Sequence, residues 1–213
     1  MGTSTLQRRS QRKASPRGEF RSSRASRHTR PFVAILLFVS SIAGRVTQAA
    51  PQAPTEYQIK AAFLYNFVKF VEWPPETLPG NRAPIVVAVL GKDPFGSALD
   101  DVILGKVVDG HPIQILRTNS LQDLKACQIA FISPSEVKRL PEILVGLRGS
   151  SVLTVGEADH FAQLGGMIQF TLEGNKVRFA INVDAAERAR LKVSSKLLSL
   201  ATVVHDEAGR GRS

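Results

Sequence analysis

The chain has 213 residues, which is room for one domain of ordinary size. Its formal charge of +10 is unevenly placed, because ten of the 28 lysines and arginines but only one of the 18 acidic residues lie in residues 1–50. Residues 51–213 are therefore nearly neutral, which argues against a nucleic-acid-binding domain in that part of the chain. The single cysteine, Cys127, excludes an intrachain disulfide.

Residues 1–49 have the order of a secretory signal peptide. A basic, serine-rich run is followed by an apolar stretch at 31–44, and the small residues Thr47 and Ala49 fit a cleavage site after Ala49. The apolar stretch is shorter than the roughly 20 residues that span a bilayer comfortably. Two alternatives stay open, an uncleaved membrane anchor and a nucleic-acid-binding arm. The expected remainder is a short leader at 50–54, one domain at 55–205 and a flexible tail at 206–213.

Residues 57–72 predict an amphipathic helix that begins after Thr55 as its N-cap and ends at Trp73, before two prolines. Apolar residues recur at three- and four-residue spacings, so one face is expected to pack on the core. That predicted face consists of Ile59, Ala62, Phe63, Phe67, Phe70 and Val71, with Lys60, Asn66 and Lys69 on other sides of the helix. An aromatic stacking platform is the alternative interpretation of its phenylalanines.

Residues 84–90 carry six consecutive apolar residues after Pro84, which predicts a strand buried on both faces. A turn bounded by glycines comes next, and a helix is expected from Pro94 to about residue 104, with Asp93 as its cap. Two further apolar runs, at 107–108 and 113–116, flank an Asp-Gly turn signal and predict a hairpin.

The middle of the chain alternates apolar runs with helix signals. Strands are expected at 128–132 and 152–155, and helices at 120–126, at about 134–147 with a break at Pro141, and at 158–164. Cys127 directly precedes the first of these strands. We interpret it as a small buried hydrophobe, with a reactive or intermolecular thiol as the alternative.

The C-terminal third predicts a hairpin of strands 167–172 and 176–181 around residues 173–175, followed by a long helix from 184 to about 204. Alternating strands and helices indicate parallel pairing with helices on both faces, and the hairpin makes the sheet mixed. The predicted fold is therefore a single α/β domain with a mixed, mostly parallel, Rossmann-like sheet of about five to six strands, a C-terminal hairpin and a long final helix.

Open α/β sheets place ligands where their strands end, so the loops after the strands are the candidate site. The candidate residues for ligand or partner binding are Gly91, Asp93, Phe95, Glu157, Phe161, Gly165 and Gly166; turn and packing roles are the alternative. The run from Gly91 to Gly96 lacks the middle glycine of a dinucleotide fingerprint, so no cofactor is expected. No catalytic residue and no metal site is predicted, because the histidines lack ligand-like spacing.

Several stretches together resemble the YfiR family of exported bacterial regulators. They are residues 57–74, 90–96, 165–170, 175–182 and 194–201, joined by 127–133 and 153–156. The resemblance covers nearly all of 55–204 in the family's order. It implies a compact α/β domain in the periplasm of a Gram-negative bacterium. Relatives often have additional cysteines that pair, and this chain has only Cys127.

The resemblance further implies a non-enzymatic repressor that holds an inner-membrane diguanylate cyclase inactive through the cyclase's periplasmic sensor domain. Release of such a repressor raises cyclic di-GMP and favours biofilm. Related domains serve as extracellular sensors of signalling kinases, so a sensor kinase is the other expected partner; a homodimer and a small ligand stay open, and nucleic acid is not expected. The alternatives are a small-ligand sensor or solute-binding protein without a cyclase, and a periplasmic hydrolase with an unrecognised site.

Overall fold

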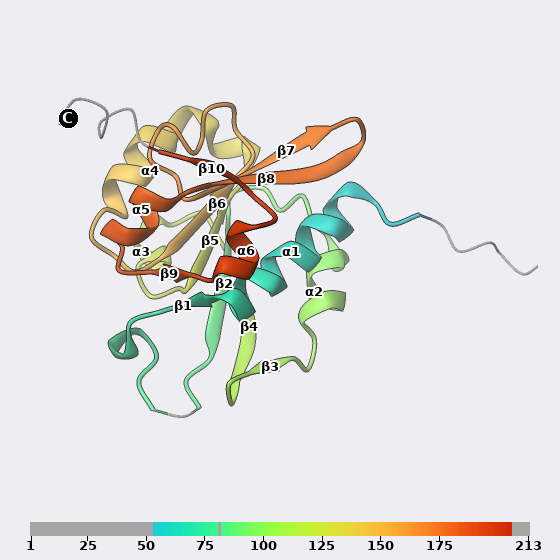
Figure 1. Cartoon of the computed structure of the whole chain (residues 1–213). Helices are drawn as coiled ribbons and strands as arrows, with labels where there is room; N and C mark the ends of the chain where they lie inside the picture. Colours follow the sequence, from blue (N-terminus) through green and yellow to red (C-terminus); the bar gives the residue numbers. More distant parts are fainter. Residues whose placement is uncertain (1–52, 81, 206–213) are drawn as a thin grey trace, which may run out of the picture. The chain divides into compact units, whose positions relative to one another are not determined.

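The computed structural model describes residues 53–80 and 82–205, and the predicted signal peptide lies outside them. Its centre is an eight-stranded sheet with the strand order β10-β8-β7-β6-β5-β2-β4-β3 (Figure 1). The strands are β2 (Ile85–Leu90), β3 (Val107–Val108), β4 (His111–Thr118), β5 (Ile129–Ile132), β6 (Leu153–Gly156), β7 (Ile168–Glu173), β8 (Lys176–Asn182) and β10 (Thr202–Val204). A separate pair joins β1 (Val71–Glu72) and β9 (Lys192–Val193).

The five strands from β4 to β7 are mutually parallel, whereas β3 and β8 run antiparallel to their neighbours β4 and β7. This arrangement confirms the predicted α/β domain with a mixed, mostly parallel sheet. The described residues contain more strands than the five to six expected. The edge strand β3 was expected as one arm of a hairpin with β4, whereas β10, at the other edge, lies where a helix was predicted.

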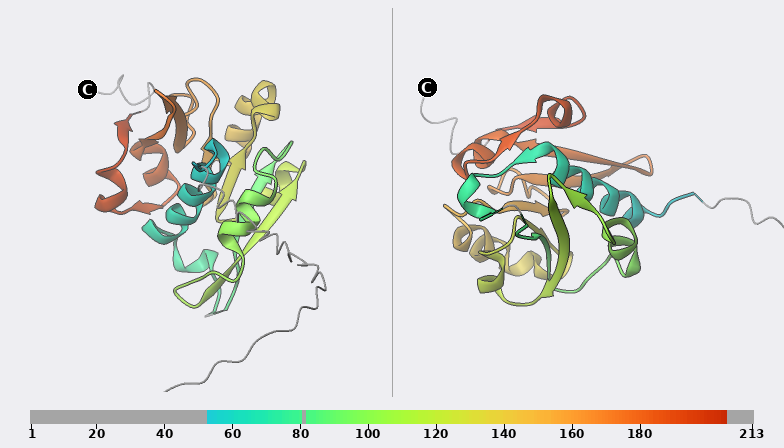
Figure 2. Two further views of the ribbon diagram at one scale, coloured as in Figure 1. Left: turned by 90° about the vertical axis from the view of Figure 1, so that its right-hand side faces the viewer. Right: turned by 90° about the horizontal axis from the view of Figure 1, so that it is seen from below.

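Strand β2 is buried on both faces, as its unbroken apolar run predicts. Ile85, Val87 and Val89 belong to one hydrophobic cluster, and Ala88 and Leu90 belong to a second cluster on the opposite face. The sheet therefore separates two cores and needs a helical layer on each side (Figure 2).

The first layer supplies side chains to the larger cluster and the second layer to the smaller one. The first layer contains α1 (Glu56–Phe70), α2 (Ser97–Ile103), α5 (Val183–Arg188) and α6 (Ser195–Leu198). The second contains α3 (Leu121–Leu124), the 3-10 helix η2 (Pro134–Arg139) and α4 (Leu140–Gly146). A further 3-10 turn, η1 (Pro75–Thr77), follows β1. The predicted break near Pro141 is confirmed, because η2 ends and α4 begins just before this proline.

Helix α1 begins with the expected Thr55 cap, which forms a capping box with Gln58. The predicted face is largely confirmed, because Phe67 and Val71 are buried and Ile59, Phe63 and Phe70 are partly buried against the same core. Two residues differ from the prediction, since Ala62 is exposed and Lys60 is buried beside Ala61, Leu64 and Val68. Phe67 anchors this face to the sheet, with ring centroids 5.8 Å from Phe170 and 5.4 Å from Phe179.

Two predicted helices differ from the structure. Helix α2 begins at Ser97 rather than Pro94, because the Asp93 carboxylate accepts a hydrogen bond from the Phe95 N–H at 2.7 Å and closes a turn before the helix. Residues 158–164 form successive turns and no helix. The fully buried Phe161 side chain fills the space beside Gly156 and Gly166, where a Cβ atom on either glycine would collide with its ring.

The long C-terminal helix predicted at 184–204 is wrong. Helix α5 ends at Arg188, Arg190 takes a left-handed backbone angle (φ 59°), and the chain then forms β9, α6 and β10. Strand β10 pairs parallel with β8, with Val203 opposite Ile181. Pairing with distant strands has overridden the helix propensity of this alanine- and leucine-rich segment.

Asn182 connects β8, α5 and the 157–167 loop, so its replacement tests this arrangement. Its side chain is fully buried, caps α5 by accepting from the Ala185 N–H at 2.9 Å, and donates to the Ala162 carbonyl at 2.7 Å. We expect Asn182→Ala to lower the free energy of unfolding by about 2–3 kcal/mol, measured by urea denaturation. Ser194→Ala removes a partly buried cap and should cost about 1 kcal/mol. Equal losses would contradict the connecting role of Asn182.

Candidate functional site

The sheet changes direction of winding between β2 and β5, where the crevice of a doubly wound fold would open. Here the loops after the two strands are joined. The Ser133 hydroxyl donates to the Lys92 carbonyl at 2.6 Å, and the Lys92 N–H donates to the Ser135 hydroxyl at 3.0 Å. Gly91 lies so close to Ser135 and Glu136 that a Cβ atom would collide with both side chains. The chain therefore fills the inner part of this crevice.

The structure brings some of the sequence-predicted residues together through α1. Phe95 packs edge-on against Tyr57, with ring centroids 5.5 Å apart, and the Tyr57 hydroxyl donates to Glu157 Oε1 at 3.0 Å. Glu157 directly follows β6, and Asp93 and Phe95 follow β2. Tyr57 thus connects the loops at the carboxyl ends of two strands.

The other predicted residues lie on the opposite face of the sheet. Phe161 is fully buried in the second hydrophobic cluster, and Gly166 lies directly against its ring. Gly165 has a left-handed backbone (φ 101°) and borders a surface groove. The seven candidate residues therefore form two groups, with Gly91, Asp93, Phe95 and Glu157 in one and Phe161, Gly165 and Gly166 in the other.

A buried ion cluster lies between α1 and the sheet. Lys60 is only 2 % exposed, and its ammonium group pairs with Glu157 Oε2 and, at 2.5 Å, with Glu56 Oε1. The same nitrogen lies 4.6 Å from the centre of the Tyr57 ring. Burial, followed by the neighbouring negative charge of Glu157, raises the pKa of Tyr57 to about 12. Lys60 was not predicted as a site residue. Its position four residues before Leu64, on the same side of α1, was the signal that could have indicated its burial.

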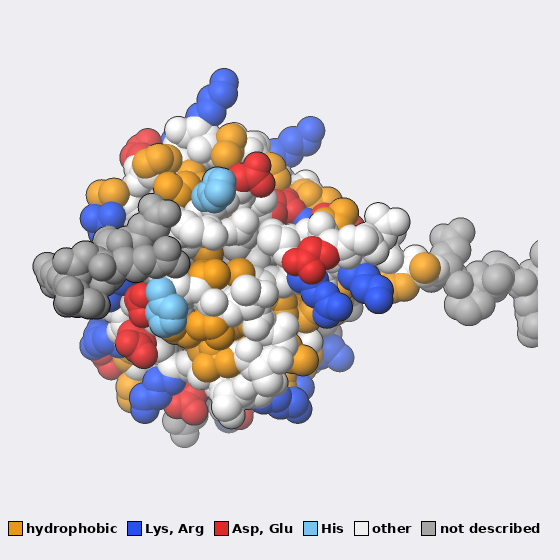
Figure 3. Space-filling model, turned by 45° about the horizontal axis from the view of Figure 1, so that its top comes forward, with side chains coloured by type: hydrophobic (Ala, Val, Ile, Leu, Met, Phe, Trp, Pro, Cys, Tyr) orange, Lys and Arg blue, Asp and Glu red, His pale blue; other side chains and the backbone are white. Residues whose placement is uncertain are grey.

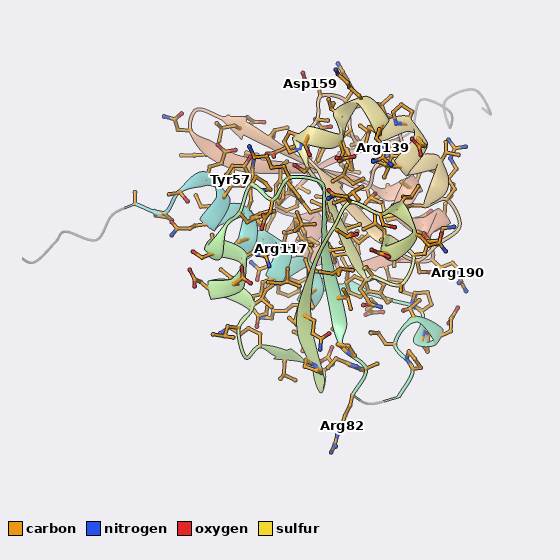
Figure 4. The ribbon with its side chains drawn as sticks, turned by 180° about the vertical axis from the view of Figure 1, so that it is seen from behind. Tyr57, Arg82, Arg117, Arg139, Asp159 and Arg190 are labelled. Atoms are coloured by element: carbon orange, nitrogen blue, oxygen red, sulfur yellow. The ribbon has the colours of Figure 1, made fainter. Side chains whose placement is uncertain are left out.

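A second, exposed ionic network fixes the loop after β2. Arg117, from β4, donates to Asp93 at 2.6 Å, to Asp100 of α2 at 2.5 Å and to the Gly96 carbonyl at 3.2 Å. The hydrogen bond from Arg117 lowers the pKa of Asp100. Tyr57 and Arg117 lie on the same side of the molecule, beside α1 and α2 (Figure 4). Together these contacts hold the loop that carries three of the candidate residues.

Cys127 is buried, and its thiol donates to the Asp123 carbonyl at 3.3 Å. Burial, with a smaller contribution from the charge of Asp123, raises the pKa of the Cys127 thiol to about 11. The thiolate is therefore scarce at neutral pH, which fits the interpretation of Cys127 as a buried hydrophobe.

A surface groove of about 730 Å³ lies at the amino ends of β6 and β7. It is lined by Leu144, Leu147, Arg148, Gly149, Ser150, Thr154, Gln163, Leu164, Gly165, Met167, Ala185, Arg188 and Ala189. The groove thus borders both helical layers, through α4 on one side and α5 on the other. Sequence reasoning identified only Gly165 among these residues, because the lining comes from four separate segments.

Within residues 53–80 and 82–205, no group of three or more histidine, cysteine or acidic side chains is arranged to hold a metal ion. No helix in this described part of the chain is long and apolar enough to cross a membrane.

The sequence model of the YfiR/HmsC-like family matches residues 57–202. The chain belongs to this family. The match covers almost the whole described domain, from the start of α1 to the first residue of β10. The resemblance stated from the sequence is thereby confirmed, and the YfiR/HmsC-like domain can be equated with the α/β fold described above.

No curated protein matches this YfiR/HmsC-like chain in sequence. Two solved structures have partly similar folds. The ABC domain in complex with L-Trp from Streptococcus pneumoniae has a TM-score of 0.48 and 10 % identity, over 68 % of this chain and 60 % of that one. A conserved domain protein from Vibrio cholerae has a TM-score of 0.42 and 12 % identity, over 67 % and 59 %. The chain therefore spans about three fifths of each structure, and neither likeness supports an argument about function.

Within the ion cluster, we expect replacement of Glu157 to lower the free energy of unfolding the most. Glu157→Gln leaves the buried Lys60 ammonium with only Glu56, whose side chain is 39 % exposed. We expect a loss of about 3–5 kcal/mol in the free energy of unfolding. Urea denaturation followed by the fluorescence of Trp73, the only tryptophan, measures it.

Two variants control for this effect. Glu142→Gln removes an exposed carboxylate 3.6 Å from Arg139 and should cost at most about 1 kcal/mol. The double variant Lys60→Met/Glu157→Gln should recover most of the lost free energy of unfolding, because it no longer buries an unpaired ammonium group. Identical unfolding midpoints for Glu157→Gln and Glu142→Gln would contradict the assignment.

The raised pKa of Tyr57 predicts a specific loss of stability in alkaline solution. Its pKa is about 12 in the folded protein against an ordinary value of 10, so the unfolded chain ionises first as pH rises. The contribution of the protonated phenol is fully present below pH 10 and is lost between pH 10 and about 12. Stability should fall more steeply over this window in the parent protein than in Tyr57→Phe. The prediction would be refuted if stability fell equally steeply with pH in the two proteins. It would also be refuted if the difference in tyrosinate absorbance between them had its midpoint near pH 10.

Proposed function

We propose that the protein is a periplasmic, non-enzymatic regulator that binds and represses the periplasmic sensor domain of an inner-membrane diguanylate cyclase. The observation that carries the proposal is the family match over residues 57–202, since YfiR-like proteins are periplasmic regulators rather than enzymes. A sensor kinase with a periplasmic domain is the second partner of the same kind, and self-association into a dimer is included in the proposal.

Repression of this kind requires no reaction at the protein. A regulator that binds the inactive state of the cyclase more tightly than the active state shifts the equilibrium by that difference in affinity. A regulator also has to reach the partner's periplasmic domain. Residues 1–49 supply the proposed export signal, and they lie outside the described part of the chain.

The proposed partner surface is formed by the loops that carry Gly91, Asp93 and Glu157, at the carboxyl ends of β2 and β6. Phe95, buried beneath the loop after β2, would hold that loop in place. The group around Phe161, Gly165 and Gly166 is proposed to hold the 157–167 loop on the other face in the same way. Lys92 is the exposed residue at the centre of the first loop, and its backbone is held on both sides by Ser133 and Ser135.

The exposed surface includes features that suit a protein partner. Several large apolar side chains in the described residues are about half exposed or more: Leu104, Val107, Val137, Val145, Leu164, Leu172, Leu200 and Val203. Figure 3 shows exposed hydrophobic side chains in small patches on one face, in its middle and along its upper edge, with charged side chains between and around them.

A matched pair of charge reversals at the two ends of β2 tests the partner surface. Lys92→Glu reverses a charge on the proposed surface. Arg82→Glu reverses a charge at an exposed position before β2, at the opposite end of the molecule from Asp159 and the 157–167 loop (Figure 4). Each protein is used to capture partners from detergent-solubilised inner membrane, with identification by mass spectrometry and measurement of cellular cyclic di-GMP. We expect the parent and Arg82→Glu to capture a diguanylate cyclase, and Lys92→Glu to capture less and to raise cyclic di-GMP.

The outcomes separate the function from the surface. Capture of a cyclase by all three proteins alike would reject the loop surface while keeping the regulatory function. Failure of the parent protein to capture any diguanylate cyclase or sensor kinase, together with unchanged cyclic di-GMP in cells that lack the protein, would reject the function itself.

A further inference from the structure

We propose that the groove between α4 and α5 binds a small organic anion with an apolar body, such as a medium-chain carboxylate. The groove lies away from Gly91, Asp93 and Glu157 of the proposed partner surface, although it shares the 157–167 loop with that surface. Ligand binding in the groove does not depend on the cyclase. The groove's volume of about 730 Å³ lies within the range of small-molecule sites, roughly 300–1,000 Å³.

The floor of the groove supplies the apolar contact. Leu144 and Leu147 come from the end of α4 and the residue after it, and Met167 comes from the residue before β7. Each retains between 4 and 8 % of its surface exposed, and all three line the groove. An apolar ligand body would remove this remaining apolar surface from water, which favours binding.

The charges around the groove favour an anionic head group. Arg148 follows α4 and Arg188 ends α5, so the two guanidinium-bearing residues come from opposite walls. No aspartate or glutamate is among the residues that line the groove. Arginine binds carboxylates through paired, charge-assisted hydrogen bonds. A cation would bring a positive charge next to Arg148 with no acid among the lining residues, so this class does not suit the groove.

The groove also has polar groups beside its charges. Gln163 and Ser150 line its sides, and the Thr154 hydroxyl in its wall already accepts from the Met167 N–H at 3.0 Å. Small-molecule sites commonly combine such an apolar floor with a few orienting polar groups. Because the groove lies at the amino ends of β6 and β7, it is at the opposite end of these strands from Glu157.

Binding of octanoate to the protein purified from cells that express the full chain tests the proposal. Isothermal titration calorimetry compares octanoate with octylammonium, which has the same apolar body and the opposite charge. We expect saturable binding of octanoate and at least about tenfold weaker binding of octylammonium. Arg148→Gln is the arginine variant to test, because Arg188 already interacts within the protein and its replacement would also disturb that interaction. It should weaken octanoate binding by about tenfold, and Arg82→Gln, the matched control away from the groove, should leave it unchanged.

A second variant tests the groove without altering a charge. Gln163→Trp places a bulky side chain at an exposed position of the lining and should abolish octanoate binding while leaving the unfolding midpoint unchanged. The absence of saturable octanoate binding would overturn the proposal. Equal affinity for octanoate and octylammonium, or equal octanoate affinity in Arg148→Gln and Arg82→Gln, would also overturn it.

Discussion

The burial of β2 on both faces is the constraint on which the rest of the structure depends. Because Val87 and Ala88 point into different cores, neither face of the sheet can be left to solvent, and each needs a helical layer. With both faces covered, exposed functional groups are confined to the ends of the strands and to the outer surface. The carboxyl ends hold the tied loops, and the amino ends of β6 and β7 hold the groove.

The ion cluster at Lys60 is the main polar feature within the otherwise apolar contact between α1 and the sheet. The ring contacts of Phe67 with Phe170 and Phe179 already favour one position of α1 against the sheet. A buried ammonium that must meet Glu157 allows few positions, because any shift leaves a charge without its partner. The cluster therefore disfavours other positions of α1, in addition to the aromatic contacts. It also fixes Tyr57 between the loops after β2 and β6, and so connects the fold to the candidate surface.

The parts of the fold that could be predicted from the sequence are those set by local chemistry. The apolar run of β2, the Thr55 cap and the hairpin turn at Gly174 and Asn175, both with left-handed backbone, depend on neighbouring residues alone. The C-terminal segment could not be predicted in this way. Its residues favour a helix locally. Pairing with β1 makes a strand of β9, and pairing with the edge of β8 makes a strand of β10; neither partner is a sequence neighbour.

The same division applies to the candidate site. The loops after β2 and β6 were accessible to sequence reasoning, since a strand that ends in a glycine turn is a local pattern. The burial of Lys60 was not, because its partner Glu157 is 97 residues away. The groove was accessible only through Gly165, since Arg148 follows α4 and Arg188 ends α5, and these two helices are far apart in the sequence.

The separation of the two regions gives a physical route for regulation. The 157–167 loop begins at Glu157, beside the proposed partner surface, and ends at Met167, in the floor of the groove. Between them Phe161 is held against Gly156 and Gly166 with no room for an added methyl group, so the loop is a tightly packed element rather than a loose connection. A ligand that moved Met167 or Gly165 would have to displace this packing, and Glu157 is only four residues from Phe161. The 157–167 loop is therefore a packed connection between the two regions. Residues 133–148 form a second connection, since Ser133 and Ser135 hold the loop after β2 and Leu144 and Leu147 line the groove.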